Sequence, residues 1–181
     1  TLITFPPQAP PSSHRSSVRD WAHHTMNRQR PSPAQMLTEP FRTKVHLRWA
    51  DIDANFHVRH SVYYDLCAQQ RTEALEVLGI TLDIMKEGHF GPVLFREECT
   101  FRREIKLHDV ILLEVRMRSL SRDHSRFAFE HVFLKEDGTH CAKLIVEGAW
   151  IDTKLRKLSA PPQLAEQAMD HVPRTEDFIW T

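Results

Sequence analysis

The sequence predicts an α+β domain in which a five-stranded antiparallel sheet wraps around a long central helix. Three observations lead to this prediction: one strand pattern opens the folded part, a long helical pattern follows it, and four further strand patterns then succeed one another. A single helix must cover one face of this sheet, and a flat sheet would leave part of the helix's broad apolar stripe in water. We therefore expect the sheet to curl around the helix.

The composition limits the partners and compartments of this protein. The chain has 181 residues, and its 24 Lys and Arg balance its 24 Asp and Glu. A neutral chain gives no reason to expect nucleic acid or an anionic membrane as a partner. No apolar run approaches the roughly 20 residues needed to cross a bilayer, and the first residues lack the basic and apolar regions of a secretory signal. The expected location is the cytoplasm.

The cysteines and glycines argue against several classes of site. Cys67, Cys99 and Cys141 are odd in number, far apart and form no CxxC motif, which is typical of reduced thiols. The five glycines form neither GxGxxG nor a Walker A motif, so a Rossmann or P-loop nucleotide site is not expected. The GxSxG motif of α/β-hydrolases does not occur either.

The chain divides into three parts by composition. Residues 1–39 are rich in Pro and Ser and show no apolar periodicity, which predicts a disordered extension. Their arginines and few acids also faintly resemble an organelle transit peptide. Residues 40–160 carry the strand and helix patterns and are expected to form the folded domain. Residues 161–181 are a polar tail in which "APPQLAEQAM" favours a short helix.

A change of period predicts the first strand and the long helix. Over residues 41–49, apolar or β-branched residues alternate with charged ones, which is typical of a strand with one exposed face. Over residues 61–78 the apolar residues recur at helical spacing, and Gly79 is a suitable residue to end the helix. A second, short helix is expected over residues 81–87.

Four strand patterns follow the helices. They cover residues 92–103, 109–119, 125–135 and 139–152, and all are rich in Val, Ile, Leu and Phe. The sequence "KEDGT" between the last two is a hairpin signal, so these strands are expected to pair in the antiparallel direction. The sheet face that the helix does not cover is expected to favour association between copies of the chain.

A polar stretch joins the first strand to the long helix. The residues "RWADIDANFHVRHSVYYDL", from Arg48 to Leu66, hold two carboxylates and two histidines within ten residues. These four side chains are able to bind a metal, but no HExxH motif or other set of ligands completes such a site. They are Asp51, Asp53, His57 and His60. We expect no metal and no cofactor.

The same stretch resembles the acyl-CoA thioesterases of the hot-dog fold, in the 4-hydroxybenzoyl-CoA thioesterase-like family. That family has a pattern close to D-x-D-x-x-G-H/V-V-x-H/N-x-x-Y at the entry to its central helix. The likeness extends over residues 41–158 and includes a common R-x-E further along the helix. The matching residues are Asp51, Asp53, His57, Val58, His60 and Tyr63, followed by Arg71 and Glu73.

The chain departs from the family pattern at positions that bear on function. Phe56 stands where glycine is usual, and His108 replaces another glycine. Many relatives also carry a glutamate on the helix near position 68 or 69, where this chain has Ala68 and Gln69. The resemblance therefore places more of the chemistry on Asp53.

The resemblance implies hydrolysis of an acyl-CoA thioester to a free acid and CoA, with Asp53 as base or nucleophile. The backbone amide of His60 would polarise the thioester carbonyl, because free N–H groups at a helix start favour negative charge. His57 would orient Asp53 or a water, or carry a proton. From the residues alone, Asp53 also fits an Asx turn, and His57 fits a hydrogen-bonded loop histidine.

Further residues are candidates for substrate binding. Tyr63 is expected to pack in the helix and to line the pocket. Arg59 fits either a substrate contact or a solvated side chain. Arg102 and Arg103 follow a predicted strand, where they would hold the phosphates of CoA or simply be solvated.

The resemblance implies acyl-CoA as substrate and a homodimer or homotetramer whose site lies where two subunits meet. Two alternatives stay open, namely a non-catalytic acyl-CoA-binding protein and a thioesterase that acts on acyl-carrier protein. Away from the site, Arg71 and Glu73 are expected to pair in or near the core. His131 is expected to be a hydrogen-bonded histidine of the core or of an interface.

Overall fold

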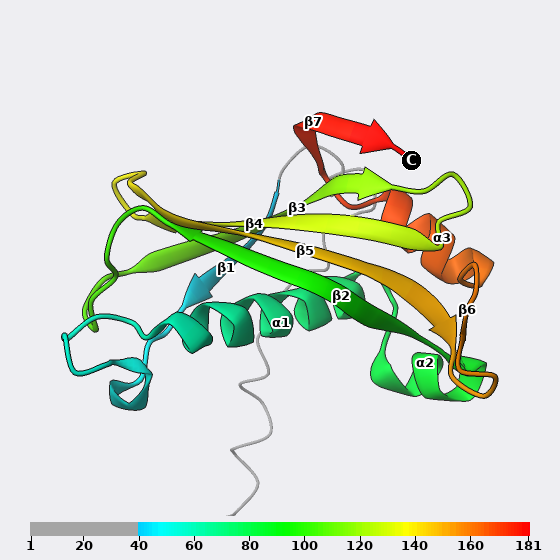
Figure 1. Cartoon of the computed structure of the whole chain (residues 1–181), viewed down its shortest axis with the longest axis horizontal. Coiled ribbons are helices and arrows are strands. Elements are labelled where there is room, and N and C mark those ends of the chain that lie inside the picture. The colour runs from blue at the N-terminus through cyan, green and yellow to red at the C-terminus, as the bar shows by residue number, and fades with distance from the viewer. Residues whose placement is uncertain (1–39) are drawn as a thin grey trace, which may run out of the picture. The chain divides into compact units, whose positions relative to one another are not determined.

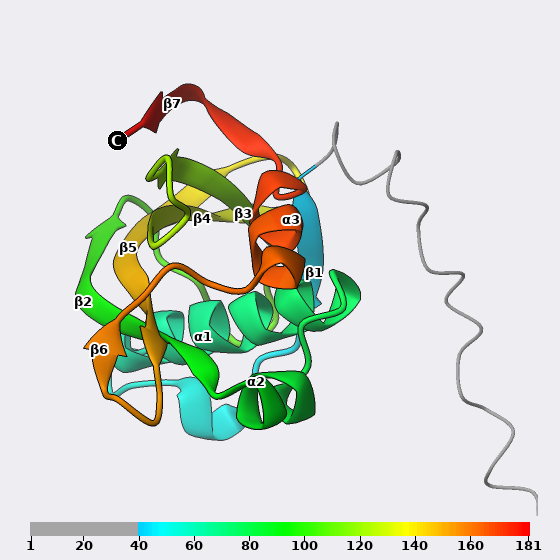
Figure 2. The same cartoon turned by 90° about the vertical axis from the view of Figure 1, so that its right-hand side faces the viewer.

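Five strands form an antiparallel sheet that curls around helix α1 (Figures 1 and 2), and this confirms the architecture predicted from the sequence. The computed structural model describes residues 40–181, so the extension expected over residues 1–39 lies outside the described residues. The order across the sheet is β1-β3-β4-β5-β2. The strands are β1 (Phe41–Val45), β2 (Phe90–Phe101), β3 (Ile111–Leu120), β4 (Arg126–Lys135) and β5 (His140–Asp152).

β1 is shorter than the sequence predicts. Its last residue, Val45, pairs with Ile111, which is the first residue of β3. Beyond this pair β3 offers no further partner, and the chain forms a short 3-10 turn at Trp49–Asp51. The prediction of a strand up to Trp49 was therefore wrong at its end, and the Trp49 side chain is 83% exposed.

α1 (His60–Val77) ends at the predicted glycine through a Schellman motif. Gly79 adopts a φ of 89°, in the left-handed region that glycine occupies without steric cost. The amide of Ile80 then donates to the carbonyl of Leu75 at 2.8 Å, which satisfies one of the last carbonyls of the helix. The chain continues directly into α2 (Leu82–Gly88).

Two strands and a helix at the C-terminal end of the chain add to the predicted sheet. β6 (Lys157–Leu158) pairs with β5, and β7 (Arg174–Trp180) pairs with β3 in the parallel direction. β7 can do so because β1 covers only the first half of the β3 edge. Between β6 and β7, α3 (Gln163–Asp170) lies across the end of the curled sheet at which α1 ends (Figures 1 and 2).

The core lies between the inner face of the sheet and α1. Alternate residues of the central strands point inward, as the period of a strand requires, and most of them are almost completely buried. Three side chains of α1 meet them from the other side. The sheet residues include Ile111, Leu113, Val115, Met117, Phe133, Leu144 and Val146, and the helix residues are Val62, Tyr63 and Cys67.

One polar network crosses this core from α1 to the sheet. The side-chain amide of Gln70 donates to the carbonyl of Leu113, so its oxygen faces Nδ1 of His131, at 2.8 Å. Nδ1 of His131 therefore carries the hydrogen, and Nε2 accepts from Arg71 at 3.3 Å. Burial, and then the charge of Arg71, hold the pKa of His131 well below its usual value. The prediction of a hydrogen-bonded core histidine is confirmed.

Arg71 pairs with a different acid from the one predicted. Its guanidinium donates to Glu97 on β2 at 3.1 Å. Glu73 instead accepts hydrogen bonds from Gln69 and Thr43. The expected pair of Arg71 and Glu73 was wrong because side chains two residues apart on a helix do not face each other.

The outer face of the sheet carries many paired charges. Arg118 contacts Glu130 and Asp177, and Lys143 contacts Glu130, at 3.2 to 3.3 Å. These ion pairs lie on the face that the sequence predicts to associate, and the association itself stays a prediction. Within residues 40–181, no helix is both long and apolar enough to cross a membrane.

Candidate active site

The loop from Asp51 to Arg59 closes on itself just before α1. Ile52 and Val58 form an isolated antiparallel bridge, and the amide of Asp53 donates to the carbonyl of His57 at 2.8 Å. The amide of Arg59 donates to the carbonyl of Asp51 at 3.0 Å. These bonds make a small hairpin whose end is the first turn of α1, so its side chains are held close to the helix start.

The carboxylate of Asp53 lies inside this hairpin. Its Oδ1 accepts from the amide of Asn55 at 2.8 Å and from the amide of His57 at 3.2 Å. The residue thus forms the Asx turn that is one of its two sequence interpretations. Oδ2 makes no hydrogen bond to any residue in the part of the chain that the structure describes, and it remains available to a ligand or a water.

The neighbouring Asp51 has a structural role. Its carboxylate is 2% exposed and accepts from the amide of Arg48 at 2.8 Å. The guanidinium of Arg48 also contacts it, with Nη2 at 2.8 Å from Oδ1. The side-chain hydrogen bond from Arg48 lowers the pKa of Asp51 against the effect of burial, so this acid stays charged and fixes the loop.

The start of α1 presents backbone amides without intrahelical partners. Arg59 is the N-cap residue, and its side chain makes no capping bond. The amides of His60 and Ser61 point out of the first turn, as the first N–H groups of any α-helix do. With the helix dipole, they form a site that favours negative charge. The side chain of His60 is exposed.

His57 pairs with an acid that the sequence analysis did not identify. Its Nε2 lies 2.9 Å from Oε2 of Glu104, and the other oxygen of Glu104 lies 3.1 Å from Nζ of Lys106. The hydrogen bond from Lys106, and then the charge of His57, lower the pKa of Glu104. The contact depends on a backbone bond from Val58 to Ile105 at 2.8 Å, and no local sequence pattern signals such a pairing.

Tyr63 belongs to the core beside this loop. Its ring packs against Phe101 and Phe133, with centroid distances of 5.0 and 4.9 Å. Burial is the largest of the effects that raise its pKa to about 12, and the charge of Asp53 is the smallest. Tyr63 therefore stays protonated, and its ring packs in the core beside the loop.

The three arginines predicted to bind substrate lie on exposed segments near the loop. Arg59 opens α1, and Arg102 and Arg103 follow the end of β2. The amides of Arg102 and Arg103 both donate to the carbonyl of Cys141, at 2.8 and 2.9 Å, which fixes their backbone. No carboxylate among residues 40–181 lies within ion-pair distance of these three guanidinium groups.

No group of three or more His, Cys, Asp or Glu side chains in residues 40–181 is arranged to hold a metal ion. The four candidate ligands of the sequence are instead used separately. Asp51 binds Arg48, Asp53 binds loop amides, His57 binds Glu104, and His60 is exposed.

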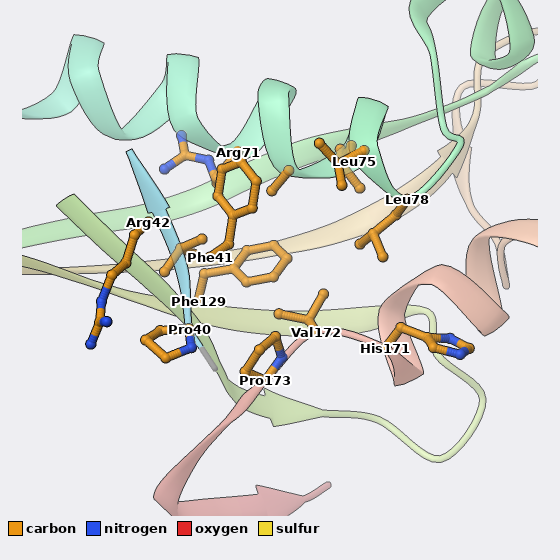
Figure 3. Close-up of a pocket in the computed structure, with 13 residues that line it drawn as sticks. Pro40, Phe41, Arg42, Arg71, Leu75, Leu78, Phe129, His171, Val172 and Pro173 are labelled. Atoms are coloured by element: carbon orange, nitrogen blue, oxygen red, sulfur yellow. The ribbon is translucent and has the colours of Figure 1, made fainter. Parts of the chain in front are cut away.

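Two spaces flank the C-terminal half of α1. The first, here called the α1 cavity, measures about 240 Å³ and lies between α1, the inner side of the sheet and residues 171–173 (Figure 3). The second, here called the α2 groove, measures about 530 Å³ and lies between α1, α2 and the start of β2. None of the four main cavities found among residues 40–181 is lined by Asp53, His57 or His60.

Comparison with known proteins points to one family. Residues 47–168 match the family model of the thioesterase-like superfamily, which is more than half of the chain. This range includes the loop, both α1 and α2, and the strands β2 to β6. No curated protein matches the chain.

Solved structures share the fold at low sequence identity. A hypothetical protein from Staphylococcus aureus, solved in complex with CoA, is 20% identical and has a TM-score of 0.69. The match covers 77% of this chain and 89% of the Staphylococcus aureus chain. A 1,4-dihydroxy-2-naphthoyl-CoA thioesterase from Synechocystis is 19% identical with a TM-score of 0.65, over 72% and 96%. A hypothetical protein from Aquifex aeolicus is 23% identical with a TM-score of 0.66, over 72% and 99%.

Proposed function

The chain belongs to the thioesterase-like superfamily, and on this basis we propose that it hydrolyses an acyl-CoA thioester to a free carboxylic acid and CoA. The observation that carries the proposal is the junction of the closed loop with α1. There Asp53 lies in the hairpin that leads into α1, with one carboxylate oxygen not bonded to any residue among 40–181. The first amides of α1, on His60 and Ser61, have no partner within the helix. Solved relatives of the same fold include a CoA complex and a CoA thioesterase, which supports the choice of substrate.

Asp53 acts as the base or as the nucleophile of the reaction. As a base, Oδ2 takes a proton from water while the water oxygen bonds to the carbonyl carbon. The C–S bond then breaks, and the CoA sulfur leaves and takes up that proton. As a nucleophile, Oδ2 itself bonds to the carbonyl carbon and expels the sulfur, and water then hydrolyses the anhydride. In both routes the bonds to Oδ1 hold the carboxylate in one orientation.

The amides at the start of α1 stabilise the negative charge on the carbonyl oxygen. One such donor contributes about 3 kcal/mol in an acyl-transfer transition state. Because the donor is the backbone of His60 or Ser61, a side-chain substitution at His60 disturbs positioning without deleting the donor. His57, held by Glu104, is placed to orient a water or to carry the proton between the water and the leaving sulfur.

The arginines bind the CoA moiety in this proposal. Arg102 and Arg103 stand on a backbone fixed by the carbonyl of Cys141, close to the loop through the bond of Val58 to Ile105. Their guanidinium groups suit the bidentate recognition of phosphate. Arg59 at the helix start lies at the same end of α1 and adds positive charge there.

A homodimer completes the site. β2 is 12 residues long and lies at the edge of the sheet, and no strand among residues 40–181 pairs with its outer row of backbone groups. Leu94, Phe95 and Phe101 on this strand are 44%, 56% and 51% exposed. Pairing of two β2 edges around a two-fold axis would cover these side chains and would supply the walls that Asp53 lacks in a single chain. A tetramer would add a second type of contact.

The test is thiol release from a panel of acyl-CoAs with short, long and aromatic acyl groups. The wild-type chain is expected to release CoA from at least one of them. Asp53→Asn is expected to lower kcat by about 100-fold or more, because a positioned general base contributes about 10²–10⁴-fold. Asp65→Asn, an exposed acid on α1, is the matched control and is expected to keep wild-type activity.

One observation favours a second candidate, an acyl-CoA-binding protein without turnover. Oδ1 of Asp53 already accepts two loop amides, so the residue has a structural use that needs no catalysis. Binding of acyl-CoA without thiol release across the whole panel would support the binding protein. Thiol release only from acyl-carrier protein thioesters would instead support a thioesterase of that substrate. Full activity of Asp53→Asn would contradict the proposed mechanism.

A further inference from the structure

The walls of the α1 cavity are mostly apolar and come from four separate parts of the fold. Phe41 of β1, Phe129 of β4 and Val172 after α3 converge on it from below, and Leu75 and Leu78 of α1 close it from above (Figure 3). Figure 3 also shows the guanidinium groups of Arg42 and Arg71 turned away from these side chains. An uncharged, hydrocarbon group is therefore the only kind of ligand that the walls suit.

The α1 cavity adjoins the α2 groove. The side chains of Arg71 and Leu75 line both spaces and stand between them. Arg71 is held by Glu97 at 3.1 Å and by His131 at 3.3 Å, so it is fixed and its charge is balanced. Leu75 makes no hydrogen bond or ion pair through its side chain and is only partly buried, so a change of its rotamer is the step by which the two spaces would join.

In the proposed dimer, the α2 groove of one copy would face the loop that carries Asp53 in the other copy. In a two-fold pair of β2 edges the strands are antiparallel, so the start of one β2 lies beside the end of the other. The groove is formed at the start of β2, by Phe90 and Pro92 with Met85 of α2. The end of β2 is tied to the loop by the contact of Tyr63 with Phe101 and by the bond of Val58 to Ile105.

We propose that the α2 groove and the α1 cavity together hold a long linear acyl chain, whose thioester is cleaved at Asp53 of the other copy. The α1 cavity receives the end of the chain and sets its maximum length. This inference rests on the proposed function, and it adds the substrate class. Cavities of about 150 Å³ hold benzene, so about 240 Å³ accommodates roughly eight to ten carbon atoms of the tail.

The test uses a phenylalanine that fills the α1 cavity and a phenylalanine on the exposed side of the same helix. Ala74 lines the cavity, whereas Glu76 is exposed on α1 and lines neither the α1 cavity nor the α2 groove. Ala74→Phe is expected to weaken the binding of S-dodecyl-CoA, a thioether that cannot be hydrolysed, by about tenfold or more. Each buried methylene contributes about fourfold in affinity, and several are displaced. Binding of S-butyl-CoA should change less than about twofold, and Glu76→Phe should bind both as the wild type does.

Because binding is measured with thioethers, the result does not depend on turnover. If the wild type shows the expected dependence on chain length but releases no thiol, the proposed hydrolysis fails and the chain site stands. If Ala74→Phe weakens both ligands equally, or neither, the chain site is overturned.

Val172→Ala provides a second variant in case Ala74→Phe does not fold, as judged by its thermal melt. It enlarges the same cavity from the opposite wall, and it is expected to strengthen binding of S-hexadecyl-CoA severalfold while leaving S-butyl-CoA unchanged. Equal effects on both ligands would again overturn the inference.

Discussion

The left-handed backbone at Phe56 explains the most visible departure from the family pattern. Phe56 has a φ of 65°, and its side chain is 80% exposed. A residue with a Cβ atom pays about 1–2 kcal/mol in this region, whereas glycine does not. A glycine would adopt this conformation without that cost, and this chain keeps the conformation with a phenylalanine.

Substitution of Phe56 by glycine and by alanine separates the backbone effect from the side chain. Phe56→Gly is expected to be about 1 kcal/mol more stable than Phe56→Ala, because alanine retains the Cβ atom that causes the strain. Urea unfolding of the two variants measures the difference. Ala54→Gly in the same exposed loop, where φ is not positive, should give no gain over the wild type. An Ala variant as stable as the Gly variant would show that the backbone is relaxed there.

At the scale of the elements, the two ends of α1 differ in how their free backbone groups are satisfied. The C-terminal end is closed by the Schellman motif at Gly79, and Ile80 after it is completely buried. The N-terminal end has no side-chain cap and leaves its amides open. The absence of a side-chain cap lowers the stability of the helix by about 1 kcal/mol. A catalytic use of these amides requires that no side chain occupy them.

Gly79→Ala tests how much the closed end contributes. Gly79 has a φ of 89°, and a Cβ atom added there would meet no heavy atom within 4 Å, so the cost is conformational and not a clash. The variant is expected to lose about 1 kcal/mol of unfolding free energy. Gly91→Ala, where φ is not positive and the nearest atom is at 3.6 Å, is the control and should change stability little. Equal losses in both variants would contradict the explanation.

At the scale of the whole molecule, the edges of the sheet bear on the proposed dimer. The β3 edge is covered by β1 and β7, whereas no strand among residues 40–181 pairs with the outer edge of β2, which carries exposed apolar side chains. The outer face carries ion pairs, including those of Arg118 and Lys143. The free β2 edge is therefore the surface on which a dimer gains most.

Leu94→Lys is expected to shift the chain from dimer to monomer. A lysine on an edge strand places a charge in the interface and opposes pairing with another edge. Sedimentation velocity over a range of concentrations should show that the affinity between the two copies is about tenfold weaker or more. Leu155→Lys, on a turn where the side chain is 69% exposed, is the control and should remain dimeric. If Leu94→Lys stays as dimeric as the wild type, the interface lies elsewhere.

The local patterns of the sequence predicted most of the fold. Alternation of period two and the helical spacing placed α1 and the long strands within a few residues of their observed bounds, and Gly79 marked the helix end. The roles of Asp53, His57 and His60 rest on the resemblance of one short stretch to a family motif, and they stay predictions. Such features are set within a few residues of chain, which is why a sequence displays them.

Only the tertiary structure determined the contacts between distant parts of the chain. The pairing of Arg71 with Glu97, the pairing of His57 with Glu104 and the early end of β1 all depend on which strands become neighbours. The α1 cavity likewise exists because residues after α3 return to the far end of α1. Contacts of this kind are chosen by packing of the whole sheet, and no local periodicity encodes them.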